Sequence, residues 1–193
     1  MKPIDKLISN DDLTNLIKQI GVFTFEALIE FVRQLPYGRT SDRSDLSLVI
    51  KEHRGTCSSK HALLKLIAEK NSILNVNLIL CIFKMNQENT PAIKSIINQY
   101  GLNYIPEAHC YIEYQVEDID VTFKNSDINH LKKDILLKEN ILPHQVIDYK
   151  IQFHKTYLQQ WIDHYQINYS IDEIWQIREK CIEQLHFFFN LKD

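Results

Sequence analysis

The segment from Cys57 to Lys70 constrains the fold more than any other part of the chain. It predicts a helix whose apolar residues cover most of the circumference: Ala62, Leu63, Leu64, Leu66, Ile67 and Ala68. The side chains that this pattern leaves for water are Lys60, Lys65 and Glu69. A helix that is apolar over so wide an arc is usually buried in the middle of a domain. The sequence therefore predicts a central helix with Cys57 at its N-terminal end.

The segments before this helix predict further helices. Thr24 is a suitable N-cap for a helix that ends at Pro36. The polar stretch 37–45 is typical of a loop, and residues 46–52 predict a short helix. That short helix runs into the break at Arg54-Gly55-Thr56.

After the central helix the period of the apolar residues changes to that of strands. Residues 76–83 form a short apolar run rich in branched side chains, which favours a strand. Residues 91–100 predict a helix with Pro91 in its first turn and Gly101 at its end. Residues 108–114 and 119–123 then predict two antiparallel strands. No Asn-Gly or Asp-Gly pair marks the turn between them, so the sequence leaves their register open.

From residue 127 onward the pattern is helical again. The longest helices are predicted over 149–165 and 171–189, and Ser170 with Glu173 forms a capping-box signal for the second. Helices followed by strands, with helices at both ends, indicate an α+β fold rather than a regular βαβ alternation. We expect a core over residues 1–126 and a C-terminal helical extension over 127–193 that packs on it.

Charge and composition exclude several classes of protein. Lys and Arg number 22 against 25 Asp and Glu, a net charge of −3, so we expect no nucleic-acid partner. The most apolar run, 78–83, is too short to cross a bilayer, and the charged residues in 1–12 do not suit a signal peptide. Four cysteines without a CxxC pair are typical of reduced thiols in a cytoplasmic protein. The oligomeric state stays open.

One of the four cysteines differs from the rest. Cys81, Cys110 and Cys181 lie in apolar runs, where a free cysteine usually acts as a small hydrophobic residue. Cys57 instead follows Gly55 at a sharp break and begins the central helix. A helix N-terminus stabilises a thiolate, and its N–H groups can receive an oxyanion. A glycine just before a nucleophile would also let a substrate backbone approach closely.

A cysteine nucleophile needs a histidine as base and a group that orients the histidine. His61 lies one turn further into the helix, so we do not expect it to reach the N-terminal tip. His109 begins a predicted strand, and strand alternation places Asp118 and Asp120 on one face of the next strand. We expect Asp120 to orient His109, with Asp118 as the alternative.

Together these segments resemble the transglutaminase-like family. Its fingerprint is Gly-x-Cys at the start of a core helix, then a strand histidine, then Asp-x-Thr on the next strand. The matching residues are Arg54-Gly55-Thr56-Cys57, Ala62-Leu63-Leu64, His109 and Asp120-Val121-Thr122. Leu35-Pro36-Tyr37 also looks like the segment that precedes the family's nucleophile. The resemblance covers about residues 24–124, and it departs from the family at Tyr111, where tryptophan is usual.

The resemblance implies a papain/transglutaminase-like core, in which the buried helix carrying the cysteine packs on an antiparallel sheet. It implies that Cys57 attacks an amide carbonyl, that His109 is the base and that Asp120 orients it. The substrate would be a peptide, a protein or a small amide. Hydrolysis, deamidation and transfer to an amine stay open. Tyr37 and Arg39 are candidates for the second oxyanion donor, and the resemblance implies neither a cofactor nor a metal.

Three alternatives remain at this point. Arg54-Gly55-Thr56-Cys57 and Asp120-Val121-Thr122-Phe123 are also similar to the arylamine N-acetyltransferases, which would make the reaction an acyl transfer to an arylamine. A binding module without catalysis on the same fold is the second. A metal site built from Cys57, His61 and His109 is the third and the weakest, because these residues lack paired-ligand spacing.

Overall fold

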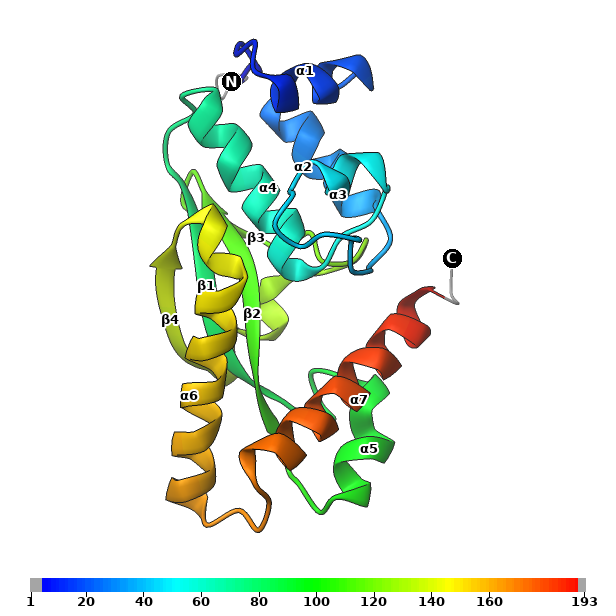
Figure 1. Ribbon diagram of the computed structural model, residues 1–193, viewed down its shortest axis with the longest axis vertical. Coiled ribbons are helices and arrows are strands. Elements are labelled where there is room, and N and C mark those ends of the chain that lie inside the picture. Colours follow the sequence, from blue (N-terminus) through cyan, green and yellow to red (C-terminus); the bar gives the residue numbers. More distant parts are fainter. Residues whose placement is uncertain (1–4, 191–193) are drawn as a thin grey trace. The chain divides into compact units, whose positions relative to one another are not determined.

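The structure is a computed structural model, and it describes residues 5–190. It confirms the α+β class, with helices and a four-stranded antiparallel sheet in the order β3–β2–β1–β4 (Figure 1). The strands are β1 (Val76–Met85), β2 (Ile105–Tyr114), β3 (Glu117–Ile119) and β4 (Ile135–Ile141).

The helices largely follow the apolar pattern of the sequence. The α-helices are α1 (Asp12–Gln19), α2 (Phe25–Gln34), α3 (Leu48–Lys51), α4 (Cys57–Lys70), α5 (Lys94–Gln99), α6 (Asp148–Tyr165) and α7 (Ile171–Asn190). Short 3-10 helices are η1 (Pro91–Ile93), η2 (Ile128–His130), η3 (Lys132–Asp134) and η4 (Pro143–Val146). The central helix has the predicted bounds, and the predicted caps form. Thr24 Oγ1 accepts the Ala27 N–H at 3.2 Å, and Ser170 N donates to Glu173 Oε2 at 2.7 Å.

The predicted second strand of the hairpin is mostly wrong. β3 ends at Ile119, and the residues 120–123 follow it outside any strand. The antiparallel pairing itself is confirmed, and Ile112 stands opposite Ile119. The turn consists of Gln115 and Val116, with φ angles of 49° and 66°. Both lie in the left-handed region, which such two-residue turns require and which Asn and Gly normally supply. The sequence therefore gave no signal for this turn.

The segment after residue 127, predicted to be helical, also contains a strand. β4 spans Ile135–Ile141, and six of its seven residues are exposed or half-buried without a clean alternation. Strand formation depends on pairing with neighbouring strands more than on intrinsic propensity. A local reading of the sequence therefore could not find this strand.

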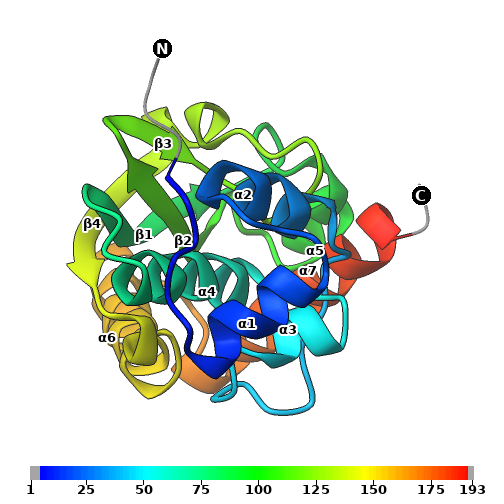
Figure 2. The same ribbon diagram turned by 90° about the horizontal axis from the view of Figure 1, so that it is seen from above.

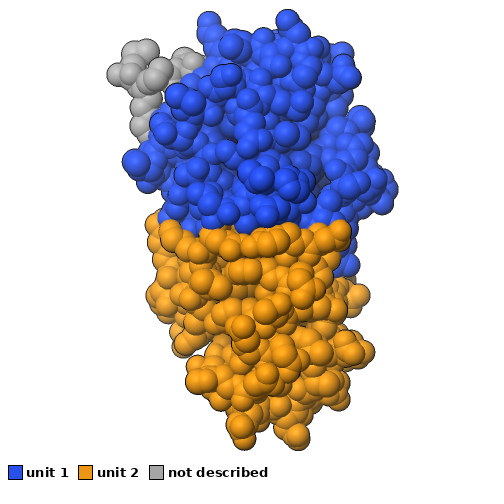
Figure 3. All heavy atoms as spheres, turned by 60° about the vertical axis from the view of Figure 1, so that its left-hand side comes forward, with its two compact units in different colours: residues 1–79, 110–128, 140–147 blue, residues 80–109, 129–139, 148–193 orange. Residues whose placement is uncertain are grey.

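The chain divides into two compact units (Figure 3). Unit 1 comprises residues 1–79, 110–128 and 140–147, and unit 2 comprises residues 80–109, 129–139 and 148–193. Each unit contains residues from both sides of position 126. Strands β1, β2 and β4 contribute residues to both units.

Unit 1 is built around α4. The helices α1, α2 and α3 and the short η4 all contact it (Figure 2). Leu63, Leu64 and Ile67 are fully buried, as the wide apolar arc of this helix predicts. Phe25 and Leu28 of α2 are also fully buried. The middle of α4 therefore belongs to a well-packed core.

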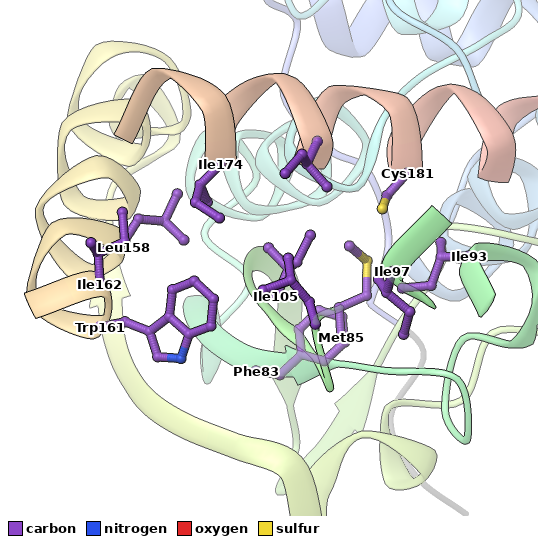
Figure 4. Packing of buried hydrophobic residues seen from close by; sticks show 12 residues of the cluster. Phe83, Met85, Ile93, Ile97, Ile105, Leu158, Trp161, Ile162, Ile174 and Cys181 are labelled. Atoms are coloured by element: carbon purple, nitrogen blue, oxygen red, sulfur yellow. The ribbon is translucent and has the colours of Figure 1, made fainter. Parts of the chain in front are cut away.

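Unit 2 has its own hydrophobic core, to which strand residues and α5, α6 and α7 contribute (Figure 4). Its buried residues are Phe83, Met85, Ile93, Ile97, Leu102, Ile105, Leu158, Trp161, Ile162, Ile174, Ile177 and Cys181. The Trp161 indole N–H donates to the Tyr104 hydroxyl at 2.9 Å, so the largest side chain of this core has its polar atom satisfied. Of the aromatic residues on α6 and α7, Trp161, Tyr157 and Trp175 pack in or against this core, whereas Tyr149, Tyr165 and Phe187 are exposed.

Candidate functional site

Cys57 is the first residue of α4. Thr56 is the N-cap, and a capping box joins it to Ser59: Thr56 N donates to Ser59 Oγ at 2.9 Å, and Ser59 N donates to Thr56 Oγ1 at 3.4 Å. Cys57 is half-buried, whereas Cys81, Cys110 and Cys181 are completely buried. Cys57 is therefore the cysteine that both solvent and a helix N-terminus can influence.

The segment that precedes the nucleophile in the resemblance lies beside it in unit 1. Tyr37 forms a parallel bridge with Gly55, and Gly55 N donates to Pro36 O at 3.2 Å. The ring of Tyr37 packs against that of Phe123, with 5.0 Å between centroids. The structure thus brings Tyr37 next to the residues that lead into Cys57.

Gly55 is required by the internal packing. A Cβ atom at this position would lie 2.8 Å from Lys60 Cγ and 3.0 Å from Ser59 Oγ. Contacts of this length force a shift, so no larger residue fits while Lys60 keeps its position. The contacts therefore explain this glycine by internal packing, without the need for substrate access that its place before Cys57 suggests.

Lys60 is the largest departure from the sequence prediction. It was expected to face water, but it is 0% exposed. Its Nζ donates to three carbonyl oxygens: Leu35 at 2.6 Å, Val121 at 3.1 Å and Thr122 at 2.9 Å. An ammonium group has three donors and no acceptor, so the carbonyls match it completely. This matching explains how a lysine can be buried here.

The charges around Lys60 act on its pKa in opposite directions. Burial lowers the pKa of Lys60 to about 8. The carboxylate of Asp120 opposes this change, the guanidinium of Arg33 adds to it, and Cys57 opposes it. Lys60 therefore loses its proton at a much lower pH than a lysine in water.

His61 is also completely buried, and both of its ring nitrogens have partners. Nδ1 lies 2.6 Å from Cys57 O, and Nε2 accepts the Val121 N–H at 2.9 Å. A carbonyl only accepts and an amide only donates, so these partners assign the neutral tautomer with the proton on Nδ1. The separation of 3.6 Å between His61 Nε2 and Asp120 Oδ1 is consequently not an ion pair. His61 joins α4 to the segment 120–122.

Asp120 lies directly after β3 and is 6% exposed. Its Oδ1 accepts the Thr122 N–H at 2.8 Å, and its main-chain carbonyl accepts from Arg33 Nη1 at 2.6 Å. Arg33, Lys60 and His61 together hold the segment 120–122 in unit 1. No local pattern in the sequence indicates this role for Arg33 or Lys60.

Asp118, the alternative orienting residue, and Arg39, a candidate oxyanion donor, also belong to unit 1. Asp118 is half-buried, stands opposite Glu113 in the hairpin and lines a surface hollow with Lys65 and Glu69. Asp120, by contrast, lies beside the second turn of α4. Arg39 is exposed and lines a shallow hollow with Thr56.

His109 lies in β2 and ends the first segment of unit 2, residues 80–109, whereas Cys57 and Asp120 belong to unit 1. It is 9% exposed, and its ring meets the ring of Phe83 edge-on, with 6.1 Å between centroids. The structure therefore places two of the three predicted catalytic residues in one unit and the third in the other.

The described part of the chain offers no metal centre. Within residues 5–190, no group of three or more His, Cys, Asp or Glu side chains is arranged to hold a metal ion. The metal alternative built on Cys57, His61 and His109 also conflicts with His61, because neither of its ring nitrogens is left for a metal. None of the helices between residues 5 and 190 has the length and apolar character needed to span a bilayer.

Comparison with known proteins adds no assignment. No family model, no curated protein and no solved structure matches the chain. Any function must therefore be argued from the residues and their contacts.

Proposed function

We propose that this protein is a cysteine-nucleophile acyl-transfer protein that acts on an amide. The observation that carries the proposal is Cys57, a half-buried thiol at the first position of a 14-residue buried helix. The partial positive charge at a helix N-terminus favours the thiolate, which is the reactive form. The other three cysteines are buried within apolar packing and lack this position.

In the proposed reaction the Cys57 thiolate attacks the carbonyl carbon and forms a C–S bond. His109 donates a proton to the leaving nitrogen as the C–N bond breaks, which leaves a thioester on Cys57. Water or an amine then attacks the thioester, loses a proton to His109 and restores the thiolate. The main-chain N–H of Cys57 is the first oxyanion donor.

The orienting role goes to Asp120 rather than to Asp118. Asp120 is buried beside α4, whereas Asp118 lines a surface hollow. The position of His109 along β2 also favours Asp120 over Asp118. β2 continues from His109 to Ile112, which stands opposite Ile119, the residue before Asp120.

The test is the rate of iodoacetamide labelling of Cys57 against pH, followed by peptide mass spectrometry. We expect Cys57 to react well below a pH of about 8.5, the ordinary pKa of a cysteine thiol. The buried cysteines provide an internal reference, since burial raises the pKa of Cys181 to about 12. The wild type is compared with His109→Ala and Asp120→Asn.

Two matched variants control for general effects. His164 is exposed on α6, so His164→Ala removes a histidine outside the proposed site, and Asp118→Asn tests the second carboxylate. We expect His109→Ala to abolish the selective labelling and His164→Ala to leave it unchanged. If Cys57 labels no faster than the buried cysteines, or ignores the loss of His109, the protein is a binding module and the catalytic proposal is wrong.

A further inference from the structure

Lys60 connects the helix that carries Cys57 to the segment that carries Asp120. Cys57 is three residues before Lys60 on α4, and two of the three carbonyls that Lys60 binds belong to Val121 and Thr122. The third, from Leu35, lies two residues before Tyr37. One ammonium group therefore fixes three separate segments that approach the proposed site in unit 1.

We propose that Lys60 is a positioning residue: two of its ammonium donors hold the carbonyls of Val121 and Thr122 against α4, the third holds Leu35 O, and loss of one proton loosens this arrangement. The inference rests on the proposed function of Cys57 and Asp120, and it adds a regulation by pH. Lys60 touches no reacting atom, so its role acts through Asp120.

The number of N–H donors on Lys60 explains why the loss of one proton changes these contacts. Protonated Lys60 has three N–H donors for three carbonyls, but the neutral amine has two donors and one lone pair. After deprotonation one buried carbonyl loses its donor and faces a lone pair instead. An unmatched buried acceptor is unfavourable, so the local structure must rearrange.

The groups that face Lys60 come from several elements. Asp120 follows β3, Arg33 lies on α2 and Cys57 on α4 itself, and all three act on its charge. Arg33 also donates to Asp120 O at 2.6 Å, so it keeps part of the segment in place when Lys60 is neutral. The expected change is therefore a local movement of residues 121 and 122 rather than unfolding.

The fit of Gly55 supports a dedicated position for the lysine stem. Lys60 Cγ occupies the space where a Cβ of residue 55 would lie, at 2.8 Å. This contact fixes the stem at the turn that leads into Cys57. The ammonium group fixes its other end at residues 121 and 122.

Carbon-detected NMR tests the inference without any need for a substrate. The protein carries Cys57→Ser, which removes the titration of that thiol, and the carbonyl ¹³C shifts of Leu35, Val121 and Thr122 are followed from pH 6.5 to 10. We expect the three signals to move together with a midpoint near 8, the pKa of Lys60. Lys60 itself is unchanged in this protein, so the measurement needs no substitution of the lysine.

Two variants sharpen the test. Lys65 lies on the same helix and donates to a single carbonyl, Val76 O, at 2.9 Å, so Lys65→Met is the matched control for Lys60→Met. We expect the common midpoint to disappear in Lys60→Met and to persist in Lys65→Met. Signals that do not share a midpoint, or that titrate unchanged in Lys60→Met, would overturn the inference.

Labelling of Cys57 in the protein with its natural cysteine supplies the functional readout. We expect the labelling rate, corrected for the fraction of thiolate, to fall at least threefold above pH 8 in the wild type. In Lys60→Met it should be low at every pH. A rate that depends on His109 but shows no such fall overturns the role of Lys60 alone. A rate that ignores His109 overturns the proposed function, and Lys60 is then a structural residue only.

Discussion

Each unit holds a cation largely away from water, completely buried at Lys60 and half-buried at Arg178, and the two units accommodate it in different ways. In unit 1, Lys60 is surrounded by three neutral carbonyls, and burial lowers its pKa to about 8. In unit 2, Arg178 pairs directly with the buried carboxylate of Glu107, with Nε–Oε2 and Nη2–Oε1 distances of 2.7 and 2.5 Å. The first arrangement holds a charge that the protein can lose. The guanidinium of Arg178, in the second arrangement, keeps its charge.

The electrostatics of Glu107 follow from its partners. Burial alone would raise the pKa of this carboxyl, but the charge and hydrogen bonds of Arg178 outweigh burial, and His154 and Lys150 add to the effect. The resulting pKa is below the ordinary value. The pair therefore stabilises the fold above that ordinary value, and the stabilisation is lost as the pH falls through the lowered pKa. The protonation of Glu107 thus stays the same near neutral pH, whereas the protonation of Lys60 changes just above it.

Breaking the pair in unit 2 should have the largest effect. Arg178→Met leaves the Glu107 carboxylate buried without its guanidinium, and we expect a loss of about 3–5 kcal/mol in the free energy of unfolding. Urea denaturation followed by circular dichroism measures it. Lys180→Met is the control on α7, because this lysine is exposed and donates to the Tyr100 hydroxyl rather than to a carboxylate. The double variant Glu107→Leu/Arg178→Met should recover most of the loss; equal stability of the double and single variants would contradict this account.

The second largest effect is expected in the free energy of unfolding measured against pH, which depends on the titration of Lys60. In the unfolded chain Lys60 keeps its proton up to its ordinary value of 10.5, whereas in the folded protein it loses it near 8. Between these values the unfolded state binds more protons, so a rising pH favours the folded state. We expect the wild type to gain up to about 3 kcal/mol over Lys60→Met across this window. Denaturation curves at several pH values measure the difference. If the free energies of unfolding of the wild type and Lys60→Met change in parallel with pH, the pKa of Lys60 is not lowered.

The contact that weakens locally and the stability that rises globally do not conflict. Deprotonation removes one hydrogen bond from the three carbonyls of Leu35, Val121 and Thr122, but it also removes the unfavourable burial of a charge. Burial is the largest cause of the lowered pKa of Lys60.

Replacement of the lysine should have a moderate effect at neutral pH. In Lys60→Met three buried carbonyls lose their donor, each at about 1–3 kcal/mol, and the relief of a buried charge offsets part of this. We expect a net loss of about 2 kcal/mol. Lys65→Met, which removes one carbonyl contact and an ion pair with Glu69, should lose less than about 1 kcal/mol. Equal losses measured by urea denaturation would show that burial does not set the two lysines apart.

The smallest expected effect is that of a single methyl group at position 55. Gly55→Ala places a Cβ against Lys60 Cγ, and we expect a loss of about 1–2 kcal/mol from overpacking. Lys60→Ala removes the clashing Cγ atom. In the double variant the two losses should therefore not add, and thermal unfolding of all four proteins completes this cycle. Strictly additive losses would mean that the contact between Gly55 and Lys60 carries no energy.

The sequence predicted the parts of the fold that depend on local pattern. The apolar arc of α4 and the caps at Thr24 and Ser170 defined helices that the structure confirms. The sequence also contained the signal for Lys60, although we assigned this residue to solvent. At 3.6 residues per turn, Lys60 lies about 140° from Lys65 and about 180° from Glu69 around the helix. The three side chains cannot share one solvent face.

The parts that the sequence did not predict depend on distant partners. β4 needs a neighbouring strand, and the turn at Gln115–Val116 uses left-handed backbone without the residues that usually mark it. The roles of Arg33 and Lys60 depend on carbonyls 25–87 positions away in the chain. Only the folded chain brings these groups together, so no local pattern could indicate them.

The contact between Gly55 and Lys60 has a consequence for how such sequences can diverge. Positions 55 and 60 form a coupled pair, because the stem of the lysine fills the volume that any side chain at 55 would need. A chain with alanine or serine at 60 loses the closest of the contacts that exclude a Cβ at 55 and keeps the contact with Ser59 Oγ at 3.0 Å, whereas a chain that keeps the lysine keeps both. The closest contact that excludes a side chain at Gly55 is therefore with Lys60. Its retention would follow the identity of residue 60 whether or not Cys57 reacts with a substrate.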